Sequence, residues 1–92
     1  MAKRQVIVRI PGLLRSYTGG AGAVEVAAAS TLAEALAGLD ARFPGLRFRI
    51  VDEQDAIRPH IKVFVDGGLV RHLGAPIADC GELMIVGALS GG

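Results

Sequence analysis

The fold is decided by one stretch of sequence, TLAEALAGLDARF, at residues 31–43. Its large apolar residues are Leu32, Leu36, Leu39 and Phe43. Their spacing places them on one face of a helix. Thr31 can cap this helix, because Glu34 follows three residues later, as a capping box requires. Pro44 and Gly45 then end the helix.

Short alternating stretches lie on both sides of this helix and predict the strands of one sheet. Apolar residues recur there at every second position, which is the period of a half-buried strand. The stretches are residues 5–10, 24–26, 61–65, 69–71 and 83–88. The glycine-rich residues 19–22 predict a hairpin loop between the first two strands, and residues 66–68 predict a second tight turn.

One helix among several strands favours an α+β domain with a β-grasp plan, as in ubiquitin. We expect a mixed sheet of four or five strands, with the main helix packed on one face. Residues 1–87 form this domain, and residues 88–92 form a flexible tail. The helix is expected to pack on Val6, Val8, Val24, Val26, Ile61, Val63, Leu83 and Ile85. Residues 46–57 are interpreted as a solvated loop anchored by Leu46, Phe48 and Ile50.

The composition excludes several classes of protein. Ten Lys and Arg against nine Asp and Glu leave a charge of +1 over 92 residues, which argues against a broad basic face for nucleic acid. The single cysteine cannot form an internal disulfide. No apolar run approaches the roughly 18 residues that a membrane span needs. Arg9 and Pro11 interrupt any signal peptide, so we expect a cytoplasmic protein that binds neither nucleic acid nor membrane.

Familiar patterns for metal binding and catalysis are missing from the sequence. His60, His72 and Cys80 are too scattered for the paired ligand spacing of a zinc site. The glycine cluster at residues 19–23 leads into a strand, whereas a phosphate cradle precedes a helix. Cys80 has no local base that would make it a nucleophile. We therefore expect no metal, no bound cofactor and no catalysis by this chain alone.

The last two residues of the sequence are Gly91 and Gly92. Small residues are common at frayed termini, which is the simpler explanation of such a pair. Here the pair follows a predicted strand, and residues 88–92 can extend about 17 Å from it. Residues without Cβ also enter slots that are too narrow for other side chains. The position therefore favours presentation of the Gly92 carboxylate to another protein's active site.

A docking surface is expected beside this tail. In a β-grasp sheet the last strand lies between the first and the third. If the helix covers one face, alternation leaves four apolar residues on the other: Ile7, Phe64, Met84 and Val86. Together they would form an exposed patch of the kind that marks a partner surface. Single scattered hydrophobic residues, which are normal on protein surfaces, are the alternative.

The whole chain resembles the ThiS/MoaD family of ubiquitin-like sulfur-carrier proteins. Three stretches carry the likeness: VRIPGLLRSYTGG at 8–20, KVFVDG at 62–67, and DCGELMIV at 79–86 with the final Gly91-Gly92. The layout is most similar to carriers of the CysO type, which serve cysteine biosynthesis. Gly87 stands where many members have proline, which predicts a looser approach to the tail. Cys80 and Ser90 also differ from the commoner residues of the family.

The resemblance implies that this chain is a carried co-substrate, or the small subunit of a synthase, rather than a catalyst. An E1-like enzyme would use ATP and Mg²⁺ to adenylate Gly92. A sulfur donor protein or sulfide would then form a thiocarboxylate, from which a sulfur-accepting synthase takes sulfur for cysteine, thiamine or molybdopterin. Gly91 and Ser90 would give the tail access to these partners.

Two other functions remain open on the sequence. A ubiquitin-like modifier would join the same activated Gly92 to lysines of another protein. A non-catalytic interaction module would keep its tail chemically inert.

Overall fold

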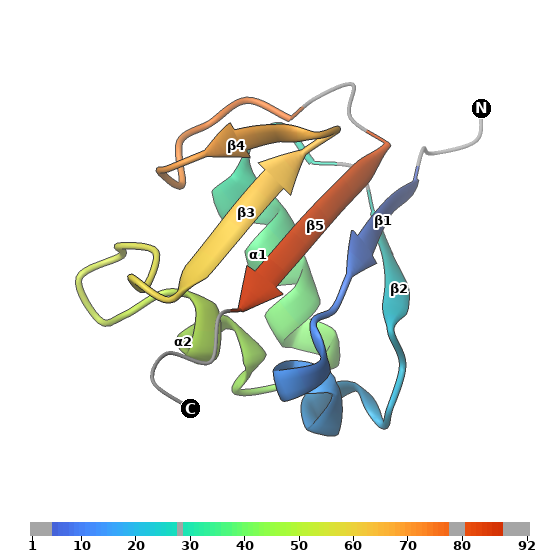
Figure 1. Cartoon of the computed structure of the whole chain (residues 1–92). Coiled ribbons are helices and arrows are strands. Elements are labelled where there is room, and N and C mark those ends of the chain that lie inside the picture. Colours follow the sequence, from blue (N-terminus) through green and yellow to red (C-terminus); the bar gives the residue numbers. More distant parts are fainter. Residues whose placement is uncertain (1–4, 28, 78–80, 88–92) are drawn as a thin grey trace.

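The structure, a computed structural model, describes residues 5–27, 29–77 and 81–87. Its elements are β1 (Gln5–Arg9), the 3-10 helix η1 (Gly12–Thr18), β2 (Ala23–Ala27), α1 (Leu32–Arg42), α2 (Leu46–Ile50), β3 (Ile61–Val65), β4 (Gly68–Val70) and β5 (Glu82–Gly87). Five strands form one sheet, and α1 lies across one face of it (Figure 1). The prediction of an α+β, β-grasp fold is confirmed.

The strands are ordered β2-β1-β5-β3-β4 across the sheet. β1 and β2 form the predicted antiparallel hairpin, and β3 is antiparallel to both β4 and β5. β1 and β5 are parallel, so the sheet is mixed. The last strand therefore lies between the first and the third, as predicted, and its carboxyl end leaves from the centre of the sheet.

The helix α1 begins as its sequence predicts. The hydroxyl oxygen of Thr31 accepts a hydrogen bond from the backbone N–H of Glu34 at 3.3 Å. The Glu34 carboxylate in turn accepts from the N–H of Ser30 at 2.9 Å, one residue before the cap. Both bonds satisfy backbone donors that would otherwise have no partner at the helix start.

The core lies between α1 and the sheet. The leucines of α1 at positions 32, 36 and 39 are at most 1% exposed, and Phe43 packs against them while half-buried. The eight strand residues predicted to lie beneath the helix are all buried. Burying one such aliphatic side chain contributes about 1.5–3 kcal/mol. Because strand side chains alternate, the remaining ones point to the opposite face.

The interpretation of residues 46–57 as a solvated loop is wrong at its beginning. Residues 46–50 form α2, and Leu46 and Ile50, one helical turn apart, are fully buried. The Asp40 carboxylate accepts from the backbone N–H groups of Gly45 and Arg47, which holds the start of α2. Phe48 is not an anchor, since it is 54% exposed. Burial of one face, rather than intrinsic propensity, stabilises so short a helix.

The predicted loop between the first two strands also contains a helix, η1, which buries Leu14 and Thr18. Gly19 follows η1 with a φ of 67°, a backbone conformation that suits glycine. Across the part of the chain that the structure describes, no helix combines the length and the apolar character needed to cross a membrane.

Candidate functional site at the exposed sheet face and the end of β5

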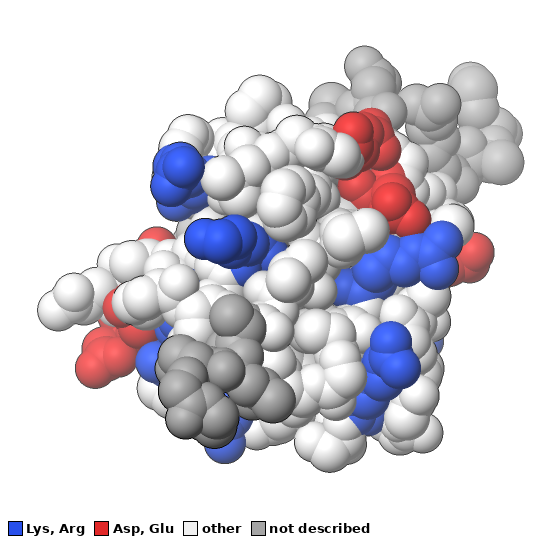
Figure 2. Space-filling model, in the orientation of Figure 1, with Lys and Arg blue, Asp and Glu red and all other residues white. Residues whose placement is uncertain are grey.

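The sheet face opposite α1 carries the apolar residues predicted as a docking surface. Met84 and Val86 are 41% and 38% exposed, whereas Ile7 and Phe64 are partly buried. Figure 2 shows an uncharged area over the middle of this face, with basic residues on both sides of it and acidic residues toward the upper right. The face thus combines an apolar centre with charges of both signs at its margin.

The strand register brings three of the four predicted residues together and adds a fourth that the sequence analysis missed. Phe64 lies directly opposite Met84 of β5 and opposite Leu69 of β4. Val86 lies two residues beyond Met84, opposite Lys62. Leu69 is 39% exposed, similar to Met84 and Val86, whereas Phe64 is partly buried. Leu69, Phe64, Met84 and Val86 are called the apolar patch below.

Ile7 points to the same face, but it lies at the margin of the patch. Its direct neighbours across the sheet are Glu25 of β2 and Glu82 of β5. The residue of β1 directly beside Met84 is Arg9. Ile7 therefore meets the apolar patch only diagonally, among carboxylates, and its role in docking stays a prediction.

The start of β5 is held by hydrogen bonds from both neighbouring segments. Asp66, in the turn between β3 and β4, has a φ of 47°. Its carboxylate accepts from the backbone N–H groups of Gly81 at 3.1 Å and Glu82 at 3.0 Å, and its own N–H donates to the Glu82 carbonyl at 3.0 Å. From the side of β1, the Arg9 guanidinium donates to the Glu82 carboxylate at 2.7 Å. Hydrogen bonds to ionised groups are stronger than neutral ones.

At the other end of β5, the backbone of Gly87 packs closely against a neighbouring side chain. Gly87 pairs with Ile61 of β3, and a Cβ at position 87 would overlap the side chain of Leu13 from η1. The expectation of a looser approach at Gly87 is therefore wrong for this residue, which is the last residue of a paired strand. The predicted tail residues Ser90, Gly91 and Gly92 lie outside the described residues, as does Cys80.

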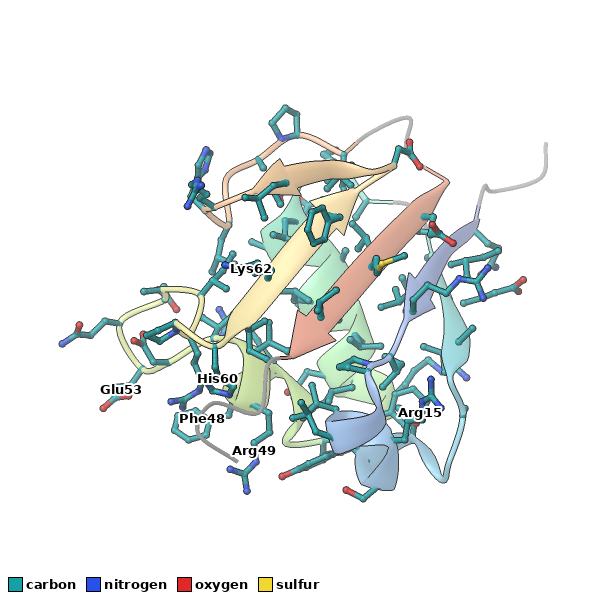
Figure 3. All side chains as sticks on the ribbon, in the orientation of Figure 1. Arg15, Phe48, Arg49, Glu53, His60 and Lys62 are labelled. Carbon is teal, nitrogen blue, oxygen red and sulfur yellow. The ribbon has the colours of Figure 1, made fainter. Side chains whose placement is uncertain are left out.

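A groove of about 630 Å³ runs beside the end of β5. One wall comes from β1, η1, β2 and the residues between β1 and η1, and the other wall comes from β5. Among the lining residues are Arg9, Ile10, Pro11, Arg15, Val86 and Gly87. The Nε of Arg15 donates to the carbonyl of Ile10 at 3.0 Å, which fixes the side chain against the groove. Figure 3 labels Arg15 at the end of the sheet where η1 lies. No local sequence pattern predicts this groove, because its two walls are more than 60 residues apart in the chain.

A second exposed feature lies on α2, at the same end of the molecule. The guanidinium of Arg58 lies 4.6 Å from the ring centroid of Phe48 and donates to the Phe48 carbonyl at 2.8 Å. The loop before Arg58 is organised by Asp52, whose carboxylate accepts from the N–H groups of Ala56 and Gln54. These bonds, that of Ala56 first, and the charge of Arg58 hold the pKa of Asp52 below its ordinary value of 3.8.

The remaining candidates for chemistry are spread over the surface. His60 precedes β3 and His72 follows β4, and both side chains are exposed. Within residues 5–27, 29–77 and 81–87, no three metal-ligating side chains gather at one point. Among the described residues, the apolar patch and the groove bring several candidate docking residues together on one surface.

A mixed sheet of this strand order with one main helix across it defines the ubiquitin-like β-grasp class of domains. The sequence model of the ThiS family matches residues 8–92, and the chain belongs to this family. It is a sulfur carrier of the ThiS/CysO type, which confirms the resemblance found in the sequence.

Known carriers match almost the whole chain. The sulfur carrier protein CysO of Mycobacterium tuberculosis is 33% identical over 92 residues, covering 95% of this chain and 98% of the relative. The structure of the BexX/CysO complex of Amycolatopsis orientalis matches with a TM-score of 0.85 at 34% identity, covering 95% and 99% of the two chains. SAMP1 of Haloferax volcanii matches with a TM-score of 0.79 at 26% identity, covering 96% and 99%.

Proposed function

We propose that this protein carries sulfur as a thiocarboxylate on Gly92 and donates it in biosynthesis. The proposal rests on one observation: in this member of the ThiS family, the last strand, β5, lies at the centre of the sheet. The strand is fixed at its start by Asp66 and ends beside the apolar patch. In the sequence it is followed by five residues that end in Gly91 and Gly92.

Activation has to come from a partner, because a free carboxylate would have to expel oxide. A carboxylate oxygen of Gly92 attacks the α-phosphorus of ATP, and pyrophosphate leaves. Sulfide then attacks the carbonyl carbon of the acyl adenylate, and AMP leaves with the bonding electron pair. ATP and Mg²⁺ belong to the E1-like enzyme, whereas this chain supplies the reacting carbon and no catalytic group.

Docking brings the tail to that enzyme and afterwards to the sulfur-accepting synthase. The apolar patch and Ile7 form the partner-binding face, and Gly91 and Ser90 give the tail access to a narrow active site. The similarity to CysO favours cysteine biosynthesis over thiamine or molybdopterin synthesis. We expect the exchange to take place in the cytoplasm, where ATP is available.

Intact-mass spectrometry tests the proposal. The protein is incubated with an E1-like enzyme, Mg²⁺, ATP and sulfide. We expect a species heavier by the difference between one sulfur and one oxygen atom, located by fragmentation at Gly92. A variant lacking Gly92 serves as the control and stays unmodified. An established carrier and its own enzyme serve as the positive control. If that carrier is converted to its thiocarboxylate while the wild-type protein stays unmodified under the same conditions, the proposal is wrong.

A second candidate function is protein modification, which the similarity to SAMP1, a small archaeal modifier protein, favours. The same acyl adenylate would then react with a lysine amine and form an isopeptide bond at Gly92. Incubation in a cell extract with ATP distinguishes the two functions. Conjugates that carry Gly92 on target lysines support modification, and a thiocarboxylate without conjugates supports sulfur transfer.

A further inference from the structure

The central strand β5 is longer than its pairing with β1. The parallel register runs from Ile7 opposite Glu82 to Arg9 opposite Met84, and ends there. β5 continues to Gly87, which pairs with Ile61 of β3 on the other side. Within the described residues, the last part of β5 therefore has a strand on one side and a groove on the other.

The main-chain groups of β5 point alternately to its two neighbours. The N–H of Ile7 donates to the carbonyl of Gly81, so odd-numbered residues of β5 face β1. The N–H of Asp66 donates to the carbonyl of Glu82, so even-numbered residues face β3. By this alternation the carbonyl of Ile85 and the N–H of Gly87 both face the groove.

β1 does not supply the next partners for these two groups. The donor that would continue the parallel ladder toward Ile85 is residue 11, and Pro11 has no N–H. The carbonyl of Pro11 accepts from Leu14 at 2.9 Å, at the start of η1. The N–H of Ile10 donates to Gly22 of the first hairpin at 2.9 Å. The chain after β1 passes into η1, so among the described residues the Ile85 carbonyl and the Gly87 N–H at this edge of β5 have no strand partner on the side of β1.

The groove along this edge has the chemistry of a peptide site. Met84 and Val86 stand exposed on one side of it. Arg15 lines the other side and is exposed, with its Nε held by Ile10. Arg9 is already paired with Glu82. The groove therefore offers main-chain partners, apolar surface and one cation that suits a carboxylate.

We infer that this edge takes up an extended segment of the E1-like enzyme as one additional short strand. The segment donates to the Ile85 carbonyl, accepts from the Gly87 N–H, packs an apolar side chain on Val86 and directs an acidic side chain to Arg15. Strand addition of this kind gives affinity through main-chain hydrogen bonds. The inference rests on the proposed function, because it names how the enzyme holds the base of the tail.

Two substitutions at one position isolate the main-chain bond. Gly87→Ala and Gly87→Pro both place a carbon against Leu13, but only proline removes the N–H. The Leu13 side chain is exposed and can move aside, and proline is tolerated where the N–H does not face a paired strand, so we expect both variants to fold. We expect the proline variant to bind the enzyme about fivefold more weakly than the alanine variant, as for one lost hydrogen bond. Titration calorimetry without ATP measures both affinities.

A charge reversal tests the acidic side chain. Arg15→Glu is compared with Arg71→Glu, which makes the same change at an exposed position after β4. We expect roughly a tenfold or greater loss of affinity for the first variant and a much smaller loss for the second. The thermal midpoint of each variant is measured alongside, so that a folding defect is not counted as lost docking.

The outcomes separate this inference from the proposed function. If the enzyme adenylates the wild-type protein while Gly87→Pro and Gly87→Ala bind alike, strand addition is wrong and the carrier function stands. If Arg15→Glu and Arg71→Glu lower the affinity for the enzyme equally, the enzyme segment does not direct an acidic side chain to Arg15. If the enzyme neither binds nor adenylates the wild-type protein, the proposed function and this inference both fail.

Discussion

The two ends of β5 are held in different ways. At its start, the carboxylate of Asp66 and the guanidinium of Arg9 bind it from both sides of the sheet. At its finish, Gly87 pairs with β3 alone among the described strands and borders a groove on the other side. The difference separates a start that is fixed from both sides of the sheet from an end that has a strand neighbour on one side and a groove on the other.

This comparison separates substitutions that unfold the protein from those that affect docking alone. Residues that point inward or fix the start of β5 are expected to lower the free energy of unfolding. Residues on the outward side of its second half are expected to change partner binding with the fold retained.

Leu83→Ala is expected to have the largest effect. Leu83 is fully buried beneath α1, and truncating such a side chain costs about 2–5 kcal/mol of stability. Urea unfolding followed by circular dichroism measures the change. Val86→Ala, directly after the core position Ile85 but on the outer face, serves as the control. It is expected to stay within about 0.5 kcal/mol of the wild type.

Asp66→Ala is expected to lower stability by about 1–3 kcal/mol, because two backbone N–H groups lose their acceptor. Asp66→Asn keeps one side-chain oxygen and tolerates the positive φ, so it should cost less. Chemical denaturation of both variants gives the two values. Equal stability of the alanine variant and the wild type would show that the start of β5 is not fixed by this residue.

Phe64→Ala and Val86→Asp are expected to weaken docking of the E1-like enzyme by about 1–2 kcal/mol, roughly tenfold, with the fold retained. The reason is that both side chains belong to the apolar patch. Adenylation is measured as pyrophosphate release at varied carrier concentration. Phe48→Ala is the matched control, since Phe48 is the more exposed phenylalanine but lies on α2. An equal loss in this control contradicts a specific role for the patch.

Acidification is expected to have the smallest effect. The lowered pKa of Asp52 means that its contribution to stability is complete above pH 3.8 and is lost as the pH falls through the lower pKa of the folded state. Because the Asp52 carboxylate orders residues 52–56, amide hydrogen exchange in this loop should rise once the pH falls below the pKa of Asp52 in the folded state. Asp52→Asn should exchange faster already at neutral pH and show no such acid transition.

The sequence predicts the sheet and its exposed face well, because strand alternation is local. Residues at every second position decide which side chains are buried, and the resemblance supplies the strand order that makes Phe64 and Met84 neighbours. Membership of the ThiS family was predictable from the same stretches. The roles of Gly91 and Gly92 rest on sequence and chemistry, since these residues lie outside the described structure.

Sequence reasoning misses α2 because two local patterns compete, and it misses two other features because they depend on distant contacts. Leu46 and Ile50 are spaced for a helix, but the alternation of Leu46, Phe48 and Ile50 obscures that signal within five residues. Asp66 lies in the predicted turn, but its carboxylate also accepts from the N–H of Gly81, 15 residues further along the chain, and no turn pattern predicts that bond. Leu69 joins the patch only through the register of β3 and β4. No local pattern reports such pairings.

The central position of β5 also determines how the molecule resists tension. An enzyme that draws the tail into its active site pulls β5 along its own axis. The hydrogen bonds to β1 and β3 run across that axis, so the force loads them in shear and all at once. An edge strand peeled from the side would lose them one after another. We therefore expect the fold to resist a force that is applied along β5 from its carboxyl end.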